Sequence, residues 1–184
     1  MKYIVILILI ISLNCNAEDT DHDHHNEHHE EKTNRKKNLK AHEHGVSILN
    51  IAQEENDLAF EFEMPGFDVV GFEYKAKKKE DIKKVKNALN IFSDYTNMIK
   101  PSVEGKCKKK SAFSEVINEG THSEFIAKYI LSCSNIVEIN KIEIMYFKSF
   151  KFSKKLNINI VSKNKSTSYQ ANKLDNILAV KGHF

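Results

Sequence analysis

The stretch AHEHGVSILNIAQEENDLAFEFEMPGFDVVGFEY, from Ala41 to Tyr74, decides how the rest of this chain can fold. Its segment VSILNIA carries apolar residues at both odd and even positions, which predicts a strand that is covered on both faces. The segment DLAFEFEM then alternates strictly between apolar and polar residues, as a half-buried strand does. The polar residues Glu54 to Asp57 fit a hairpin turn between the two strands, and Pro65 with Gly66 ends the second.

Two histidines, His42 and His44, precede this hairpin. In an extended segment they project from the same side of the chain, because side chains of a strand repeat every two residues. Neutral imidazole is a common ligand of zinc, nickel and copper. The pair therefore indicates half of a metal site, although two exposed residues at the entrance of a strand would show the same spacing.

The order of HxHG, apolar strand, polar turn, alternating strand, proline and VGFE resembles the ZrgA-like family of His-rich periplasmic proteins associated with bacterial zinc uptake. The similarity is densest over residues 41–74, and HSEFIAKYILSC (His122 to Cys133) and MYFKSF are also similar. The resemblance implies that zinc is the metal and strengthens the metal role of His42 and His44. One position departs from the family: the residue after the GFE triplet is often a histidine there and is Tyr74 here.

A zinc site needs a third or fourth ligand from elsewhere in the chain, because zinc in proteins is four-coordinate. His122 is the main candidate, and Glu73 and Glu124 follow it. We expect His183, at the extreme C-terminus, to belong to a frayed end.

The N-terminus has the pattern of a secretory signal. Lys2 precedes the apolar segment YIVILILIISL, which is too short to span a bilayer comfortably. Ala17, with the small Cys15 two residues before it, offers a cleavage site, so residues 1–17 are predicted to be a signal peptide and the protein to be periplasmic. Lipidation of Cys15 is the alternative, and the residues before it fit that modification less well.

Removal of the signal leaves Cys107 and Cys133. An even pair of cysteines in an exported protein is most simply a disulfide, and a pair of thiolate metal ligands is the alternative. Cys133 ends one predicted strand and Cys107 precedes another, so the bridge would join neighbouring strands.

Residues 18–39 are predicted to be a disordered metal-binding tail, because they lack an apolar period. From Glu18 to Glu31 there are seven acidic residues, five histidines and no lysine or arginine. Several exchanging sites of modest affinity should form there, and a solubilising linker is the alternative interpretation. The candidate ligands are His22, His24, His25, His28 and His29.

The remaining chain is basic, with 27 basic and 18 acidic residues from Lys32 to Phe184. The lysines are scattered and arginine is rare, so we interpret them as solvated surface and expect no nucleic acid as a partner.

From Lys77 onward, apolar residues recur every three or four positions, which predicts an amphipathic helix that Pro101 stops. The stripe consists of Ile82, Val85, Ala88, Leu89, Phe92, Tyr95 and Ile99. The later segments SAFSEVIN, HSEFIAKYILSCS, VEINKIEIMYFKSF and KLNINIVS favour strands, with a short helix as the alternative for KIEIMYFKSF. We therefore predict one α+β domain over residues 40–184, with a largely antiparallel sheet and one long amphipathic helix packed on it.

The sequence contains no GxSxG, no HExxH and no glycine-rich phosphate loop, so we do not expect an enzyme. The predicted function is binding of a divalent metal in the periplasm: zinc first, with nickel or copper as alternatives. The His-rich tail and the His42/His44 site would capture the metal, and a membrane importer would receive it. The alternative is an exported interaction or pH-sensing scaffold with adventitious metal affinity.

Overall fold

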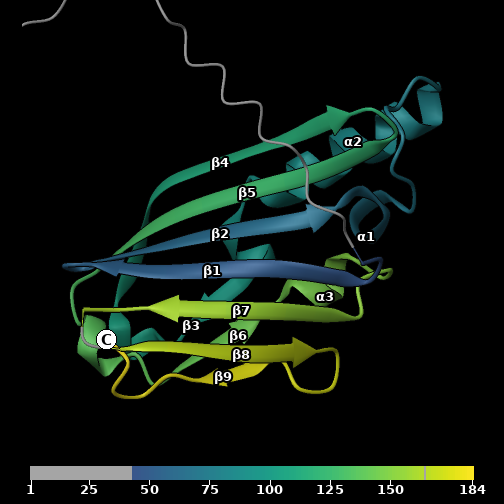
Figure 1. Cartoon of the computed structure of the whole chain (residues 1–184). Helices are drawn as coiled ribbons and strands as arrows, with labels where there is room; N and C mark the ends of the chain where they lie inside the picture. Colours follow the sequence, from purple (N-terminus) through teal and green to yellow (C-terminus); the bar gives the residue numbers. More distant parts are fainter. Residues whose placement is uncertain (1–42, 164) are drawn as a thin grey trace, which may run out of the picture. The chain divides into compact units, whose positions relative to one another are not determined.

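The computed structural model describes residues 43–163 and 165–184 of the chain. The predicted signal peptide, the His-rich tail, His42 and the predicted boundaries at residues 17 and 39 lie outside the described residues. Figure 1 shows the strands and helices, with η for 3₁₀ helices in the text. In chain order they are β1 (Val46–Glu54), β2 (Asp57–Pro65), α1 (Gly66–Val70), α2 (Lys79–Phe92), η1 (Tyr95–Asn97), β3 (Ile99–Pro101), η2 (Val103–Gly105), β4 (Cys107–Glu119), β5 (His122–Cys133), η3 (Ile136–Glu138), β6 (Lys141–Ile144), α3 (Tyr146–Ser149), β7 (Lys155–Val161), β8 (Ser166–Asn172) and β9 (Ile177–Ala179).

Six strands form the larger sheet, in the order β4-β5-β2-β1-β7-β8. Neighbouring strands are antiparallel except β1 and β7, which run parallel. The predicted hairpin is confirmed: β1 pairs with β2, and Glu54 lies opposite Asp57 across the turn. The strict alternation in β2 is confirmed as well, since its inward residues are at most 1% exposed: Leu58, Phe60, Phe62 and Met64.

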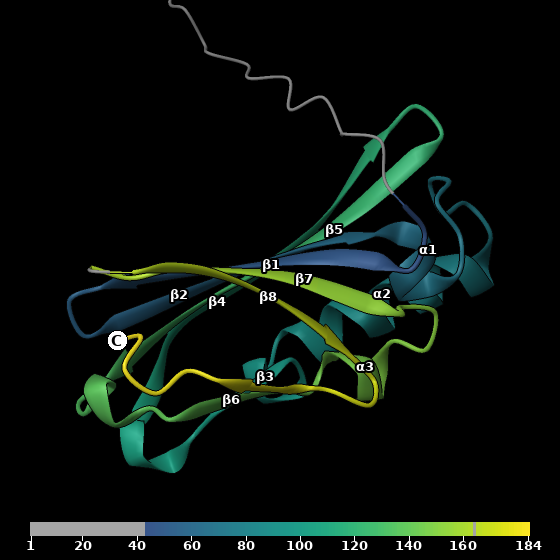
Figure 2. The same ribbon diagram turned by 60° about the horizontal axis from the view of Figure 1, so that its bottom comes forward.

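One face of the larger sheet carries the core. Helices α2 and α3 and strands β3 and β6 lie on the same side of it (Figure 2). Leu49 and Ile51 of β1 point to that side and are 0% and 1% exposed, whereas Ile48 is 37% exposed. The expectation that β1 is covered on both faces is therefore wrong, because antiparallel sheets commonly leave one face to solvent.

The predicted α+β class with one long helix is also wrong. Of the described residues, 48% are in strands and 23% in helices, and the nine strands form two sheets. The second sheet has the order β3-β6-β9 and is antiparallel. Its strands have three or four residues each, which is too short for alternation to reveal them in the sequence. The described part of the chain is thus mostly β.

The helix predicted to run to Ile99 ends earlier. Helix α2 has 14 residues and stops at Phe92, and Ile99 belongs to β3. The apolar spacing continues beyond Phe92 because Met98 and Ile99, both 0% exposed, are also buried. Ile99, however, is buried as part of the second sheet and not as part of the helix. The hydroxyl of Tyr129 on β5 donates to the carbonyl of Phe92 at 2.8 Å and ties the end of the helix to the larger sheet.

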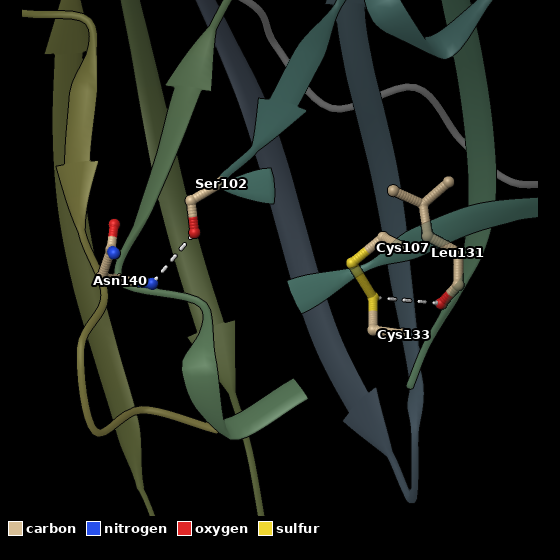
Figure 3. Close-up of a disulfide and its surroundings, with 5 residues drawn as sticks. All are labelled: Ser102, Cys107, Leu131, Cys133 and Asn140. Carbon is tan, nitrogen blue, oxygen red and sulfur yellow. Dashed lines mark hydrogen bonds between the residues drawn. A yellow bond between two sulfur atoms is a disulfide. The ribbon is translucent and has the colours of Figure 1, made fainter. Parts of the chain in front are cut away.

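The predicted bridge between Cys107 and Cys133 is confirmed as a disulfide (Figure 3). The two cysteines lie opposite each other where β4 begins and β5 ends. Nearby, the N–H of Asn140 donates to the hydroxyl of Ser102 at 3.2 Å. This bond joins the segment between β3 and η2 to the segment between η3 and β6. The alternative of a thiolate metal pair is thereby excluded in this structure, because both sulfurs are bonded to each other.

Helices in the described part of the chain are all too short or too polar to cross a membrane.

Candidate metal site

The corner after β2 brings distant parts of the chain together. Helix α1 is capped by Gly71, whose φ of 83° lies in the left-handed region that favours glycine. The chain thereby turns back, and Phe72 and Glu73 follow. Gly66, at the start of α1, packs so closely on Ser123 of β5 that an added Cβ would collide with the serine hydroxyl. Glycine is therefore needed for the first residues of β5 to lie against this corner.

Glu73 lies between two histidines that are far from it in the sequence. Its Oε1 is 2.9 Å from Nε2 of His44, and its Oε2 is 2.9 Å from Nδ1 of His122. The Glu73 side chain is 14% exposed, while those of His44 and His122 are 54% and 59% exposed. One nearly buried carboxylate therefore faces two imidazoles that solvent can reach.

The imidazole of His44 is held in place by aromatic stacking. Its ring lies 4.6 Å from the ring of Phe67, with only 13° between the planes. Phe67 belongs to α1 and contacts Phe152 in turn, with ring centroids 5.5 Å apart. Stacking restricts the rotation of this half-exposed imidazole, whose Nε2 lies 2.9 Å from Glu73 Oε1.

Asp68 fixes the backbone on which His44 stands. Its carboxylate is fully buried and accepts from the N–H of Gly45 at 2.6 Å and from the hydroxyl of Ser47 at 2.9 Å. The Ser47 hydroxyl also contacts that of Tyr146 at 2.8 Å. Burial raises the pKa of Asp68, while the Gly45 N–H, the Ser47 hydroxyl and the nearby His44 oppose that rise. Sequence reasoning missed Asp68, and its one signal is an acid inside the apolar segment FDVVGF.

The described side chains as they stand contain no group of three or more His, Cys, Asp or Glu that could hold a metal ion. Around Glu73, the nitrogens of His44 and His122 lie 2.9 Å from different carboxylate oxygens. A tetrahedral zinc ion with bonds of about 2.0 to 2.1 Å keeps its ligand atoms about 3.3 Å apart. The two nitrogens contact different oxygens of Glu73, so both imidazoles would have to move to share one zinc ion with it, and the side chains of both histidines are more than half exposed.

The other predicted site residues are placed as follows. Glu124 is buried, with 5% exposure. It follows His122 by two positions in β5 and therefore lies on the same side of the strand. The hydroxyl of Tyr74 donates to Asp81 at 3.0 Å, so this residue contacts helix α2. His42 and the tail histidines lie outside the described residues.

The expectation of a frayed C-terminus at His183 is wrong. His183 is only 6% exposed, and its Nε2 lies 2.7 Å from the hydroxyl of Tyr169. Burial lowers the pKa of His183, because desolvation disfavours the charged imidazolium. This histidine is part of the packed body.

Comparison with known proteins assigns the chain to a family. No curated protein matches the chain. The model of the ZrgA family of zinc uptake proteins matches residues 41–180, which include His44, Glu73 and His122. Because this match covers most of the chain, the chain belongs to the ZrgA family of zinc uptake proteins.

Proposed function

We propose that this protein binds zinc in the periplasm and passes it to a membrane importer. The observation that carries the proposal is the cluster of His44, Glu73 and His122. One carboxylate contacts two imidazoles there, one just before β1 and one at the first residue of β5. Membership of a zinc uptake family supports zinc as the cargo, although the donor atoms would also suit nickel or copper. The role requires binding and release and no catalytic step.

In this proposal zinc enters between the carboxylate and the imidazoles. His44 would bind through Nε2, His122 through Nδ1 and Glu73 through a carboxylate oxygen. His42 stands two residues before His44 and would supply a fourth ligand, with Glu124 as the alternative. Stacking on Phe67 and the hold of Asp68 on Gly45 support a preorganised site, which loses less entropy on binding.

The segment from Glu18 to Glu31 would collect zinc before it reaches this cluster. Its five histidines and seven acids offer many weak combinations of ligands. Imidazole binds metal only when it is unprotonated, so the capture of zinc by histidines should weaken as the pH falls through about 6.5.

The core site is tested by calorimetric titration of zinc into the purified protein. The pair His44→Ala and His122→Ala should lose the tightest zinc equivalent, with a decrease in affinity of at least about 100-fold, because even neighbours of ligands contribute about 10- to 100-fold. Glu63→Gln, which removes one acid from the outward side of β2, is the matched control and should bind as the wild type does. Unchanged tight binding in the double variant would refute the core site.

The tail is tested separately. Deletion of residues 21–31 should lower the number of zinc ions bound and leave the tightest affinity unchanged. An unchanged stoichiometry would refute collection by the tail. If zinc bound nowhere on the chain but its partners changed between pH 5 and 8, the scaffold alternative would replace this proposal.

A further inference from the structure

A groove of about 220 Å³ opens behind the cluster, between helix α2, strands β4 and β5 and the segment that follows α1. Its walls are mainly apolar side chains: Phe72, Ile82, Val85, Val116 and Phe125. Ile82 is 38% exposed, although it stands on the helix face that packs toward the sheet. The groove therefore leaves apolar surface open to solvent at a concave place, where a ligand can be enclosed.

The rim of this groove is strongly cationic. Seven lysines stand within residues 75–86, and all of them are exposed. Lys75 and Lys86 line the groove itself. Of the two acids in this segment, Asp81 is 7% exposed and is held by the Tyr74 hydroxyl and by Lys84 at 3.6 Å, so Glu80 is the acid left at the surface. Such a rim attracts anionic groups.

The groove and the cluster share their wall. Phe72 and Tyr74 line the groove, and Glu73 between them contacts the two histidines. Ser123 lines the groove, and its neighbour His122 contacts Glu73. The same two backbone segments therefore carry groove-lining residues and two of the three cluster residues.

We propose that this groove, named here the α2 groove, receives an extended acidic segment with one apolar anchor side chain, from the protein that takes over the zinc. The anchor would fill the apolar floor, and the acids would meet Lys75 and Lys86 at the rim. A concave apolar floor of this volume fits a side chain, whereas a flat lipid surface could reach only the rim lysines. The identity of the partner as the zinc acceptor rests on the proposed function; the docking surface does not.

A buried hydroxyl at the floor supports an occupant. Ser123 is 2% exposed, and its Oγ has no hydrogen-bond partner among the described residues. Buried polar groups in native proteins are nearly always bonded, so an orphan of this kind at the wall of a groove indicates a missing partner. The hydroxyl faces Gly66, so it would have to rotate about the Cα–Cβ bond to meet a polar group of the docked segment.

Docking in the α2 groove should change zinc affinity at the cluster, and zinc should change docking by the same factor, because coupling between two sites is reciprocal. A shift of Glu73 would change the distances from its two oxygens to His44 and His122, and with them the arrangement of ligand atoms offered to a metal ion. The groove would thereby link arrival at the acceptor to release of the metal.

The test uses the full chain and a fluorescein-labelled peptide with one phenylalanine within a run of aspartates, followed by fluorescence anisotropy. The pair Lys75→Glu and Lys86→Glu should weaken peptide binding by about tenfold, since each reversal replaces an attraction by a repulsion. The pair Lys100→Glu and Lys181→Glu makes the same change of charge at exposed positions away from the groove and should leave binding unchanged. Replacement of the peptide's phenylalanine by serine should also weaken binding about tenfold or more.

Equal weakening by both lysine pairs would overturn the proposal, as would binding of phosphatidylglycerol vesicles without binding of the peptide. The anisotropy titration is made without metal and is then repeated with zinc. The peptide could bind with the predicted effects of the lysine variants while zinc fails to bind at the cluster. That result would support the α2 groove and contradict only the zinc site. Binding of both without any mutual effect would overturn the coupling.

Discussion

Replacement of Asp68 should separate the positioning of His44 from the stability of the fold. In Asp68→Ala the Gly45 N–H loses its acceptor at a buried place, which costs about 1 to 3 kcal/mol. The Ser47 hydroxyl loses Asp68 but can still donate to Tyr146 at 2.8 Å, so its loss should be small. The free energy of unfolding should therefore fall by about 2 kcal/mol.

Asp68→Asn is the matched variant. Its carbonyl oxygen can still accept from the Gly45 N–H, and its amide can donate to the Ser47 hydroxyl, so every group keeps a partner. We expect it to change the free energy of unfolding at pH 7 by less than about 1 kcal/mol. Zinc affinity at the cluster should fall in Asp68→Ala and stay near that of the wild type in Asp68→Asn, because only the first leaves the backbone of His44 without its anchor.

The pH dependence has a definite sign. Because burial raises the pKa of Asp68 above its ordinary value of 3.8, the folded protein binds this proton more tightly than the unfolded chain does. The stabilising contribution of the protonated carboxyl is fully present below pH 3.8 and is lost as the pH rises through the folded value. The wild type should therefore lose stability relative to Asp68→Asn over this rise in pH.

Urea denaturation of the three proteins from pH 4 to 7, with zinc calorimetry at pH 7, measures all of these effects. The reasoning is refuted if Asp68→Ala unfolds within about 0.5 kcal/mol of the wild type, the range of ordinary surface substitutions. It is also refuted if both variants lose zinc equally.

Other parts of the fold allow shorter predictions. Replacing Cys107 and Cys133 by serine should lower the free energy of unfolding by about 3.5 kcal/mol, the chain-entropy value for a separation of 26 residues. Thiol titration of the unreduced wild type should find no free thiol at these positions. Two reactive thiols there would contradict the bridge. Gly71→Ala should lower the free energy of unfolding, measured by urea denaturation, by about 1 to 2 kcal/mol. The left-handed φ disfavours a side chain, and the new Cβ meets the ring of Phe152 at 2.9 Å. An unchanged free energy of unfolding would argue against this turn. Tyr129→Phe leaves a buried carbonyl without its donor and should lower the thermal midpoint by an amount equivalent to about 1 kcal/mol, and an unchanged midpoint would speak against that bond.

The β1–β2 hairpin could be predicted from the sequence because its alternation and its turn are local signals. The second sheet could not, since β3, β6 and β9 pair residues far apart in segments of three or four residues. The end of α2 was misplaced for a related reason: Ile99 continues the helical spacing but is buried as part of a strand. Periodicity reports which residues are buried and does not report which layer buries them.

The candidate site shows the same limit. His44, Glu73 and His122 could each be named from the sequence as possible ligands by residue type and family resemblance. Their meeting at Glu73 depends on the turn at Gly71, and no pattern in the sequence gives its direction. Asp68 was missed because its partners are a backbone N–H and a hydroxyl, which carry no signature in the sequence.

The parallel pairing of β1 with β7 has a consequence for the order of assembly. The segment of His44 enters β1, and the carbonyl of Gly45 accepts from the N–H groups of Lys154 and Lys155, more than a hundred positions later in the chain. Ribosomes deliver the N-terminus first, and contacts of high sequence separation form late. Before β7 has been synthesised, the backbone next to His44 lacks the hydrogen bonds from Lys154 and Lys155. The protein should therefore acquire the ability to hold zinc late in folding.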